Sequence, residues 1–417
     1  MVKTSLLAGL LLGLTGLFAG CRDPMKVCSS HADCPGGQCV LGSCAAGDGG
    51  PNGLGLVGYI RSTTGTALAL HGQGSHVYLG DWGASPTGAS ARGNLQDYDV
   101  SDPAHPVLRD NLFLCDFDCE LGDISGDDSR LFVAADQLGV VTIDPLGTAG
   151  NSLANHTTTL TDTGGDVALV TLVTLPAPKL GSFLLVGAHS SAVLAFYDVT
   201  GSSVLKTPIK YSPLAAQAEK ASSLYAVQAR EQVGYLMGVT AASELKFETV
   251  DLSPLPGGAP VQMSELPWPI GLYGGPGSLR VQGNYVYVAA SSLDTSQDLV
   301  GGYYGGLRVI NVADPRHPYF AGDGLDLPSV GSVPWNGAGL DVDESTVYFV
   351  TEKGLTVIDV SVPAQPQLAA SYPFPADFLP CLGGRAMVKG DLVYVAAFCP
   401  SQDGLQGRGG LAIYRRY

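Results

Sequence analysis

The sequence predicts an all-β protein built from seven copies of one four-stranded antiparallel sheet. Short apolar strands recur along the chain, turn residues separate them, and no long apolar helical period follows the first twenty residues. The clearest copy begins with Leu279–Val281, turns at Gly283-Asn284, and continues through Tyr285–Ala290 to Leu307–Asn311. The 56 glycines and 27 prolines also indicate many tight turns.

The number of copies comes from the strand that is most apolar in each copy, which we take as the second. Seven segments have this character: His76–Gly80, Leu131–Ala135, Phe183–Gly187, Val233–Gly238, Tyr285–Ala289, Val347–Val350 and Val393–Ala397. A third strand follows each and often ends in Asp or Asn, as at Asp99, Asp144, Asp198, Asp251, Asn311 and Asp359. These positions are spaced about 45 to 60 residues apart, the period of β-propeller blades with long loops.

Ring closure supports the count of seven. The last copy stops at Tyr417 just after its third strand, and Leu54–Ser62 is an extra strand ahead of the first full copy. We expect Leu54–Ser62 to join the last blade, which closes the ring and covers two exposed sheet edges. Six or eight blades stay open as alternatives because the third and fourth copies are degenerate.

The turn after the third strand carries a family resemblance. Asp99-Val-Ser-Asp-Pro-Ala-His-Pro106, Asn311-Val-Ala-Asp-Pro-Arg-His-Pro318 and Asp359-Val-Ser-Val-Pro-Ala-Gln-Pro366 resemble LVIVD repeats. That family forms β-propellers and occurs on bacterial cell surfaces, so the resemblance implies the same fold and setting here. His105 and His317 occupy equivalent positions, so we assign them to the turn and not to a metal site.

The N-terminus has the features of an export signal. Residues 1–20 contain one lysine and an apolar run, Leu6–Phe18, that is too short to span a membrane as a helix. The ending Ala19-Gly20-Cys21 resembles the lipobox of bacterial lipoproteins, which implies that Cys21 is acylated and becomes the first mature residue. Ordinary secretion after cleavage is the alternative. Residues 21–53 then form a Cys-rich segment with a Gly-rich linker, and residues 54–417 form the propeller.

Nine cysteines are present, so eight remain beside Cys21, an even number that favours disulfides in an exported chain. The N-terminal four lie in a segment too short to bury a core, which two disulfides would hold as a small stalk. Zinc is disfavoured there because no C-x₂-C pair occurs and only His31 is nearby. In the propeller we expect two further pairs, with cross-pairing left open. The candidates are Cys28, Cys34, Cys39, Cys44, Cys115, Cys119, Cys381 and Cys399.

Aromatic residues gather in the predicted long loops of one face. In a four-stranded blade, the loop between the second and third strands and the loop to the next blade emerge on the same side. Aromatic side chains are enriched at recognition surfaces, which favours partner binding there. The alternative is that these side chains pack down and cap the channel. The candidates are Trp82, Trp268, Tyr273, Tyr303, Tyr304, Trp335 and Phe378.

Three carboxylates lie at or near the starts of first strands, which line the channel of a propeller. If Asp123, Asp166 and Asp341 converge, they could hold Ca²⁺, which prefers several oxygen ligands. Some propeller hydrolases use such an ion to polarise a substrate oxygen. The alternative is three solvated carboxylates on separate blades. We expect no other cofactor.

Composition and motifs limit the function. A net charge of −16 without a Lys/Arg cluster argues against nucleic-acid binding. G-x-S-x-G, Walker, H-E-x-x-H and EF-hand motifs do not occur in the sequence. We therefore predict a non-enzymatic, monomeric lipoprotein of the cell envelope, anchored to the outer membrane and facing the periplasm or the surface. It would bind a protein or glycan through its loop-rich face. The alternatives are a calcium-dependent, lactonase-like propeller hydrolase and an envelope assembly scaffold.

Overall fold

The protein is described by a computed structural model, and the chain divides into two compact units, residues 1–50 and 51–417. In the first unit, β1 (Gln38–Val40) and β2 (Ser43–Ala45) form an antiparallel hairpin whose register places Cys39 opposite Cys44. The described residues are 38–40, 43–45, 53–62, 67–83, 92–118, 120–143, 153, 156–159, 167–176, 181–188, 191–201, 208–211, 223–239, 245–268, 278–292, 304–328, 339–351, 354–375, 378, 383–398 and 409–417.

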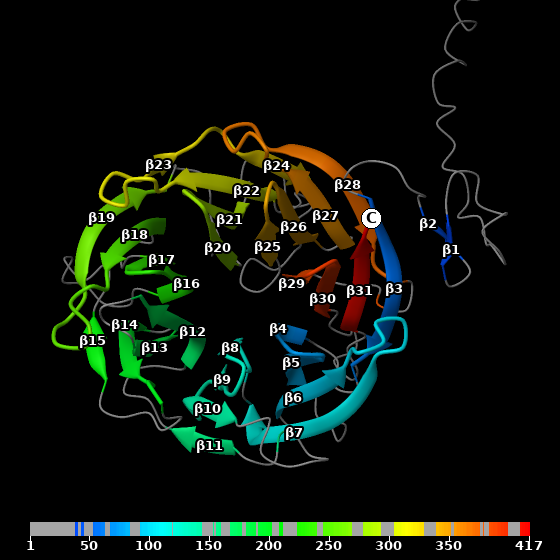
Figure 1. Ribbon diagram of the computed structural model, residues 1–417, viewed down its shortest axis with the longest axis horizontal. Coiled ribbons are helices and arrows are strands. Elements are labelled where there is room, and N and C mark those ends of the chain that lie inside the picture. Colours follow the sequence, from blue (N-terminus) through cyan, green and yellow to red (C-terminus); the bar gives the residue numbers. More distant parts are fainter. Residues whose placement is uncertain are drawn as a thin grey trace, which may run out of the picture. The chain divides into compact units, whose positions relative to one another are not determined.

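The second unit is a ring of seven antiparallel sheets around a central channel (Figure 1). In blades 1 to 6 the strands follow chain order from the channel outward. Blade 1 comprises β4 (Ala67–Gln73), β5 (His76–Gly83), β6 (Arg92–Asp99) and β7 (Val107–Asp118). Blade 2 comprises β8 (Asp123–Gly126), β9 (Leu131–Ala134), β10 (Val140–Ile143) and β11 (His156–Thr159). Blade 3 comprises β12 (Val167–Leu175), β13 (Gly181–Ala188), β14 (Ser191–Asp198) and β15 (Ile209–Tyr211).

The remaining blades repeat this order. Blade 4 comprises β16 (Ser223–Arg230), β17 (Val233–Val239), β18 (Leu245–Asp251) and β19 (Val261–Pro267). Blade 5 comprises β20 (Ser278–Gln282), β21 (Tyr285–Ser292), β22 (Tyr304–Asn311) and β23 (Tyr319–Phe320), and β24 (Leu325–Pro328) also pairs with β22. Blade 6 comprises β25 (Leu340–Asp343), β26 (Thr346–Thr351), β27 (Gly354–Asp359) and β28 (Gln367–Pro373).

Blade 7 closes the ring as predicted. It takes β29 (Gly383–Lys389), β30 (Leu392–Phe398) and β31 (Gly410–Arg416) from the C-terminus, and β3 (Leu54–Arg61) adds as its outermost strand. The pairing runs from Leu54 opposite Arg416 to Arg61 opposite Gly410. Both the seven-blade count and the closing strand are therefore confirmed, and the open edge of β31 is covered.

Burial explains why some strands could be recognised in the sequence and others could not. The second and third strands of a blade have neighbouring blades on both faces, so every residue of β9 and of β26 is buried. Such strands are continuous apolar runs. The outermost strands β19 and β28 are mostly exposed and have no apolar pattern of this kind. Among the described residues, the core consists of seven clusters of buried side chains, each shared by two neighbouring blades.

The Asp or Asn that ends a third strand initiates a turn. Its side-chain oxygen accepts a hydrogen bond from the backbone N–H two residues later, the geometry that makes Asx residues turn formers. Five blades share this bond: Asp99 to Ser101 (2.9 Å), Asp198 to Thr200 (2.9 Å), Asp251 to Ser253 (2.8 Å), Asn311 to Ala313 (2.9 Å) and Asp359 to Ser361 (2.8 Å). In the same turns, Nδ1 of His105 lies 2.8 Å from Asp102, and Nδ1 of His317 lies 2.8 Å from Asp314. Both histidines thus belong to the turn, as predicted.

These turns also dock against the preceding blade. Gly322 of blade 5 approaches the backbone of Ala364 in the turn of blade 6 so closely that a Cβ there would overlap its carbonyl oxygen. Gly58 of β3 meets the carbonyl oxygen of Pro103 in blade 1 in the same way. Thr249 of blade 4 donates a hydrogen bond of 2.5 Å to the carbonyl oxygen of Pro315 in blade 5. The repeated turn therefore helps to fix the position of each blade against the preceding one.

Candidate functional site

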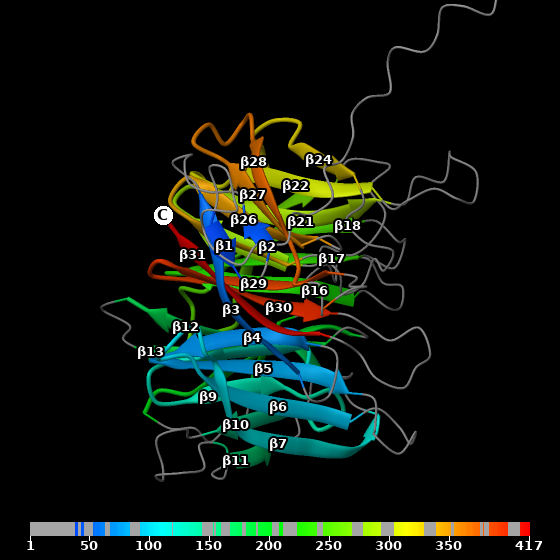
Figure 2. The ribbon, with the colours of Figure 1, turned by 90° about the vertical axis from the view of Figure 1, so that its right-hand side faces the viewer.

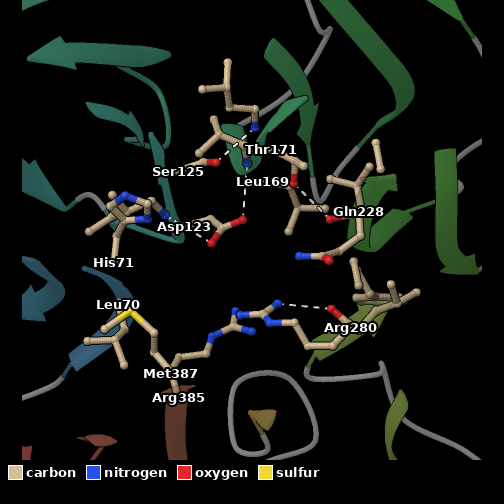
Figure 3. A pocket seen from close by; sticks show the side chains of 18 residues that line it. Leu70, His71, Asp123, Ser125, Leu169, Thr171, Gln228, Arg280, Arg385 and Met387 are labelled. Carbon is tan, nitrogen blue, oxygen red and sulfur yellow. Dashed lines mark hydrogen bonds between the residues drawn. The ribbon is translucent and has the colours of Figure 1, made fainter. Parts of the chain in front are cut away.

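A cavity of about 270 Å³ lies at the centre of the ring (Figure 3). The innermost strands of six blades line it, namely β4, β8, β12, β16, β20 and β29. Side chains on a strand alternate between its faces, so Arg385 and Met387 of β29 both line the cavity. The polar lining residues are His71, Asp123, Ser125, Thr171, Gln228, Arg280 and Arg385.

Polar side chains of the inner strands bind the backbone of the next blade. Asp123 Oδ2 accepts from the N–H of Val170 at 3.4 Å, and Asp341 Oδ2 accepts from the N–H of Val388 at 2.7 Å. The two aspartates therefore have equivalent roles, in blades 2 and 6. Comparable contacts join the other blades: Gln73 to Asp127, Ser125 to Leu172, Thr171 to Val227, Arg230 to Gly283, Arg280 to Asp341 and Lys389 to Gly74. Because every blade junction has such a contact, the channel wall is a rigid scaffold.

Two arginines dominate the electrostatics of the cavity. Nε of Arg280 lies 3.2 Å from Asp341 Oδ1, and Nη1 donates to the carbonyl oxygen of Leu279 at 3.0 Å. The guanidinium groups of Arg280 and Arg385 point toward each other from opposite sides of the cavity (Figure 3). Burial lowers the pKa of Arg385, the negative charges of Asp123 and Glu120 oppose this, and the positive charge of Arg280 lowers the pKa further. Burial also raises the pKa of Asp123, against the opposing effect of the two arginines.

His71 of β4 completes the polar lining. Burial lowers its pKa to about 4, the charge of Lys389 acts in the same direction, and Asp127 opposes both. The imidazole is therefore neutral at pH 7 and contributes one donor and one acceptor rather than a charge. It borders the cavity on the side of Asp123 (Figure 3).

The structure describes two of the three predicted calcium ligands, Asp123 and Asp341. Asp123 and Asp341 do lie on inner strands, but their oxygens accept from backbone N–H groups, and Asp341 also pairs with Arg280. Asp166 lies outside the described residues. Within the described part of the chain, no group of three or more His, Cys, Asp or Glu side chains could hold a metal. The reason is that the channel-facing carboxylates fix neighbouring blades to one another instead of sharing one point.

The predicted aromatic surface needs a correction at two positions. Trp268 is only 7% exposed and Phe378 is 0% exposed. Trp268 packs edge-on against Phe320 at a centroid distance of 5.1 Å, and Phe378 packs edge-on against Tyr59 at 5.7 Å. Both belong to the buried core between blades and are therefore unavailable to a partner. The side chains of the other five candidates lie outside the described residues: Trp82, Tyr273, Tyr303, Tyr304 and Trp335.

The cysteine predictions remain predictions. The backbone register places Cys39 opposite Cys44, and Cys115 falls within β7. The other candidates lie outside the described residues: Cys21, Cys28, Cys34, Cys119, Cys381 and Cys399.

His71, Arg280 and Arg385 were not among the predicted site residues. A usable signal was present for the arginines, because each is a cation in the first, channel-lining strand of its blade, between apolar or small residues. What the pattern lacked was any indication that the strands of blades 5 and 7 face each other across the channel.

Among the residues that the structure describes, no helix is long and apolar enough to cross a membrane.

Comparisons with known proteins agree with the fold. A family model described as "LVIVD repeat" matches residues 274–294 and 340–373, within blades 5 and 6. No curated protein matches the chain. The β-propeller domain of Myceliophteria thermophila Cps50 (Swd1) superposes with a TM-score of 0.55 at 14% identity, covering 87% of this chain and 99% of that one. The computationally designed Ika8 protein aligns with a TM-score of 0.47 at 11% identity, covering 86% of this chain and 99% of that one. This chain is thus a seven-bladed β-propeller carrying LVIVD repeats, a construction that fits a binding or scaffold role.

Proposed function

We propose that this protein is a non-enzymatic lipoprotein of the bacterial cell envelope that binds a protein or glycan partner through the loop face of its ring. We define the loop face as the edge at which second strands end and third strands begin, as at Gly83 and Arg92. The turn face is the opposite edge, with two-residue turns such as Gly390-Asp391. The observation that carries the proposal is that the chain enters the ring on the turn face.

Three contacts place that entry. Leu54, the first residue of β3, pairs with Arg416, and the N–H of Tyr417 donates to the carbonyl oxygen of Gly53 at 3.0 Å. The N–H of Arg416 donates to the carbonyl oxygen of Asp391 at 2.8 Å, within the turn that defines this face. The C-terminus is on the left in Figure 2, whereas β7 ends on the right, at the loop face. A tether that precedes Gly53 would therefore join the ring at the turn face, the edge opposite the loop face.

The architecture supports a binding role on that face. Loops mounted on a rigid scaffold are the usual location of recognition residues. The ring supplies such a scaffold because β3 closes it and polar contacts join its inner strands. The resemblance to LVIVD repeats supports the cell-surface setting.

The lipid anchor is tested with Cys21→Ser. We expect the parent protein to incorporate radiolabelled palmitate and to partition into detergent, and the variant to do neither. Equal labelling of both proteins would exclude an anchor at Cys21. Labelling of intact and permeabilised cells then decides between a surface-facing binder and a periplasmic scaffold.

Partner binding is tested by crosslinking in intact envelopes followed by affinity purification. We expect Trp82→Ala and Trp335→Ala to reduce recovery of the crosslinked partner at least tenfold, since aromatic anchors dominate interfaces. Tyr319→Ala is the matched control, because Tyr319 is 56% exposed and β23 begins at the turn face. Unchanged recovery in both tryptophan variants, or an equal loss in the tyrosine variant, would refute binding through the loop face.

A further inference from the structure

We propose that the central cavity is a binding site for a small oxyanion, a carboxylate or phosphate group held between the guanidinium groups of Arg280 and Arg385. This site is separate from the loop face, and the proposal does not depend on the partner or anchor proposed above.

Two arginines from different blades converge on the cavity. Arg280 comes from β20 of blade 5 and Arg385 from β29 of blade 7, and both project into one cavity of about 270 Å³ (Figure 3). Arg guanidinium groups bind carboxylate and phosphate through parallel N–H donors. Two groups that face each other can bind two oxygens of the same anion from opposite sides. The cavity volume is at the lower end for ligand pockets, which suits a small molecule rather than a polymer.

Both arginines already meet negative charge, from Asp341 and Asp123 and, for Arg385, also from Glu120. Asp341 lies on the intervening blade, but it contacts Arg280 through Nε only, and its other oxygen accepts from Val388. The guanidinium of Arg280 donates from Nε to Asp341 and from Nη1 to the carbonyl oxygen of Leu279. Asp123 is the other carboxyl group in the cavity, and both of its oxygens accept from backbone N–H groups. The two guanidinium groups thus face each other with carboxylates beside them, and Asp123 and Asp341 also accept hydrogen bonds from the backbone of the channel wall.

The rest of the cavity lining supplies hydrogen-bond donors. Two like charges in a poorly solvated site repel strongly, and an anion between them converts this repulsion into attraction. Ser125 Oγ accepts from the N–H of Leu172 at 2.9 Å, so its hydroxyl hydrogen remains to be donated to an acceptor. The Gln228 amide and the neutral imidazole of His71 offer further donors at the cavity wall. The lining therefore provides donors for an acceptor-rich ligand.

The test is binding to the purified full chain at constant ionic strength, by calorimetry and by thermal unfolding. Inorganic phosphate and sodium acetate are the probes, and sodium chloride is the control. We expect one probe to bind saturably and to raise the unfolding midpoint with the logarithm of its concentration, whereas chloride does not. Which probe is tighter decides between phosphate and carboxylate ligands.

Variants assign the effect to the cavity. Arg280→Lys and Arg385→Lys retain the charge but lose the planar pair of donors, so each should weaken binding about tenfold. Asp123→Asn removes a competing negative charge and should tighten binding between twofold and tenfold, an increase that a merely structural role would not produce. Arg109→Gln is the control, since Arg109 is exposed on β7 and pairs with Asp99. Absence of binding beyond chloride, or affinities of all three cavity variants within twofold of the parent, would overturn the proposal.

Discussion

Asp341 provides the sharpest test of how the ring is held together. Its side chain joins three blades: it lies on β25 of blade 6, pairs with Arg280 of blade 5, and accepts from the N–H of Val388 in blade 7 at 2.7 Å. Asp341→Ala removes an acceptor that bonds a charged donor, worth about 1.5–3 kcal/mol, and leaves a partly buried N–H unsatisfied at about 1–3 kcal/mol. Because the side chains of Asp341 and Arg280 are 18% and 29% exposed, we expect a loss near the low end, about 3 kcal/mol.

Asp343 is the matched control on the same strand. Asp343 pairs with Arg416, but these side chains are 35% and 30% exposed, and Arg416 also donates to the carbonyl oxygen of Gly390. Asp343→Ala should therefore cost less than about 1 kcal/mol. Asp341→Asn keeps an acceptor for Val388 and loses the charge beside Arg280. Its loss of stability should therefore lie between those of Asp341→Ala and Asp343→Ala.

The assay is urea denaturation at pH 7, followed by circular dichroism with and without calcium. We expect the midpoint to fall for Asp341→Ala while the slope with urea stays constant, because the buried surface is unchanged. Equal losses of stability for Asp341→Ala and Asp343→Ala would refute the role we assign to Asp341 in joining three blades. A loss that appears only in the presence of calcium would instead restore Asp341 as a metal ligand, as the hydrolase alternative requires.

Three further predictions concern the cavity, a blade junction and the core. The pKa of His71 is about 4 in the folded protein and near 6.5 in the unfolded chain. Its neutral form therefore contributes about 3 kcal/mol to the free energy of unfolding above pH 6.5, and this contribution is lost as the pH falls to 4. His71→Gln should make the unfolding midpoint less dependent on pH over that range. An unchanged pH profile would show that His71 does not cause this pH dependence. Gly322→Ala should cost about 1–3 kcal/mol in urea denaturation because its Cβ meets the backbone of the next blade. Gly234→Ala should be near neutral, since its Cβ would have no neighbour closer than 3.6 Å, and equal costs would contradict the docking of the turn. Trp268→Ala should lower stability by about 3–5 kcal/mol as a core truncation, whereas a change below 1 kcal/mol would show that the indole is not packed as described.

Local sequence determined the blade and the count of blades. Strands with a neighbouring blade on each face must be apolar throughout, so β9 and β26 were visible as continuous runs. The Asx turn is a local structure, and Asp99 and Asp359 could therefore be assigned from their neighbours in the chain. Closure by β3 was predictable because a three-stranded last blade leaves an unpaired edge.

Tertiary structure alone decided which side chains meet across blades. Arg280 and Arg385 converge because the ring brings the inner strands of blades 5 and 7 to one cavity. No local sequence pattern encodes this arrangement of the blades. Trp268 and Phe378 follow outer strands, where the sequence favours exposed loops, but the gaps between blades bury them. Asp123 and Asp341 were predicted on the channel, but their partners are backbone groups of the next blade. Strand type and turn type depend on neighbours along the chain, whereas burial and ion pairing depend on neighbours in space, which only the closed ring defines.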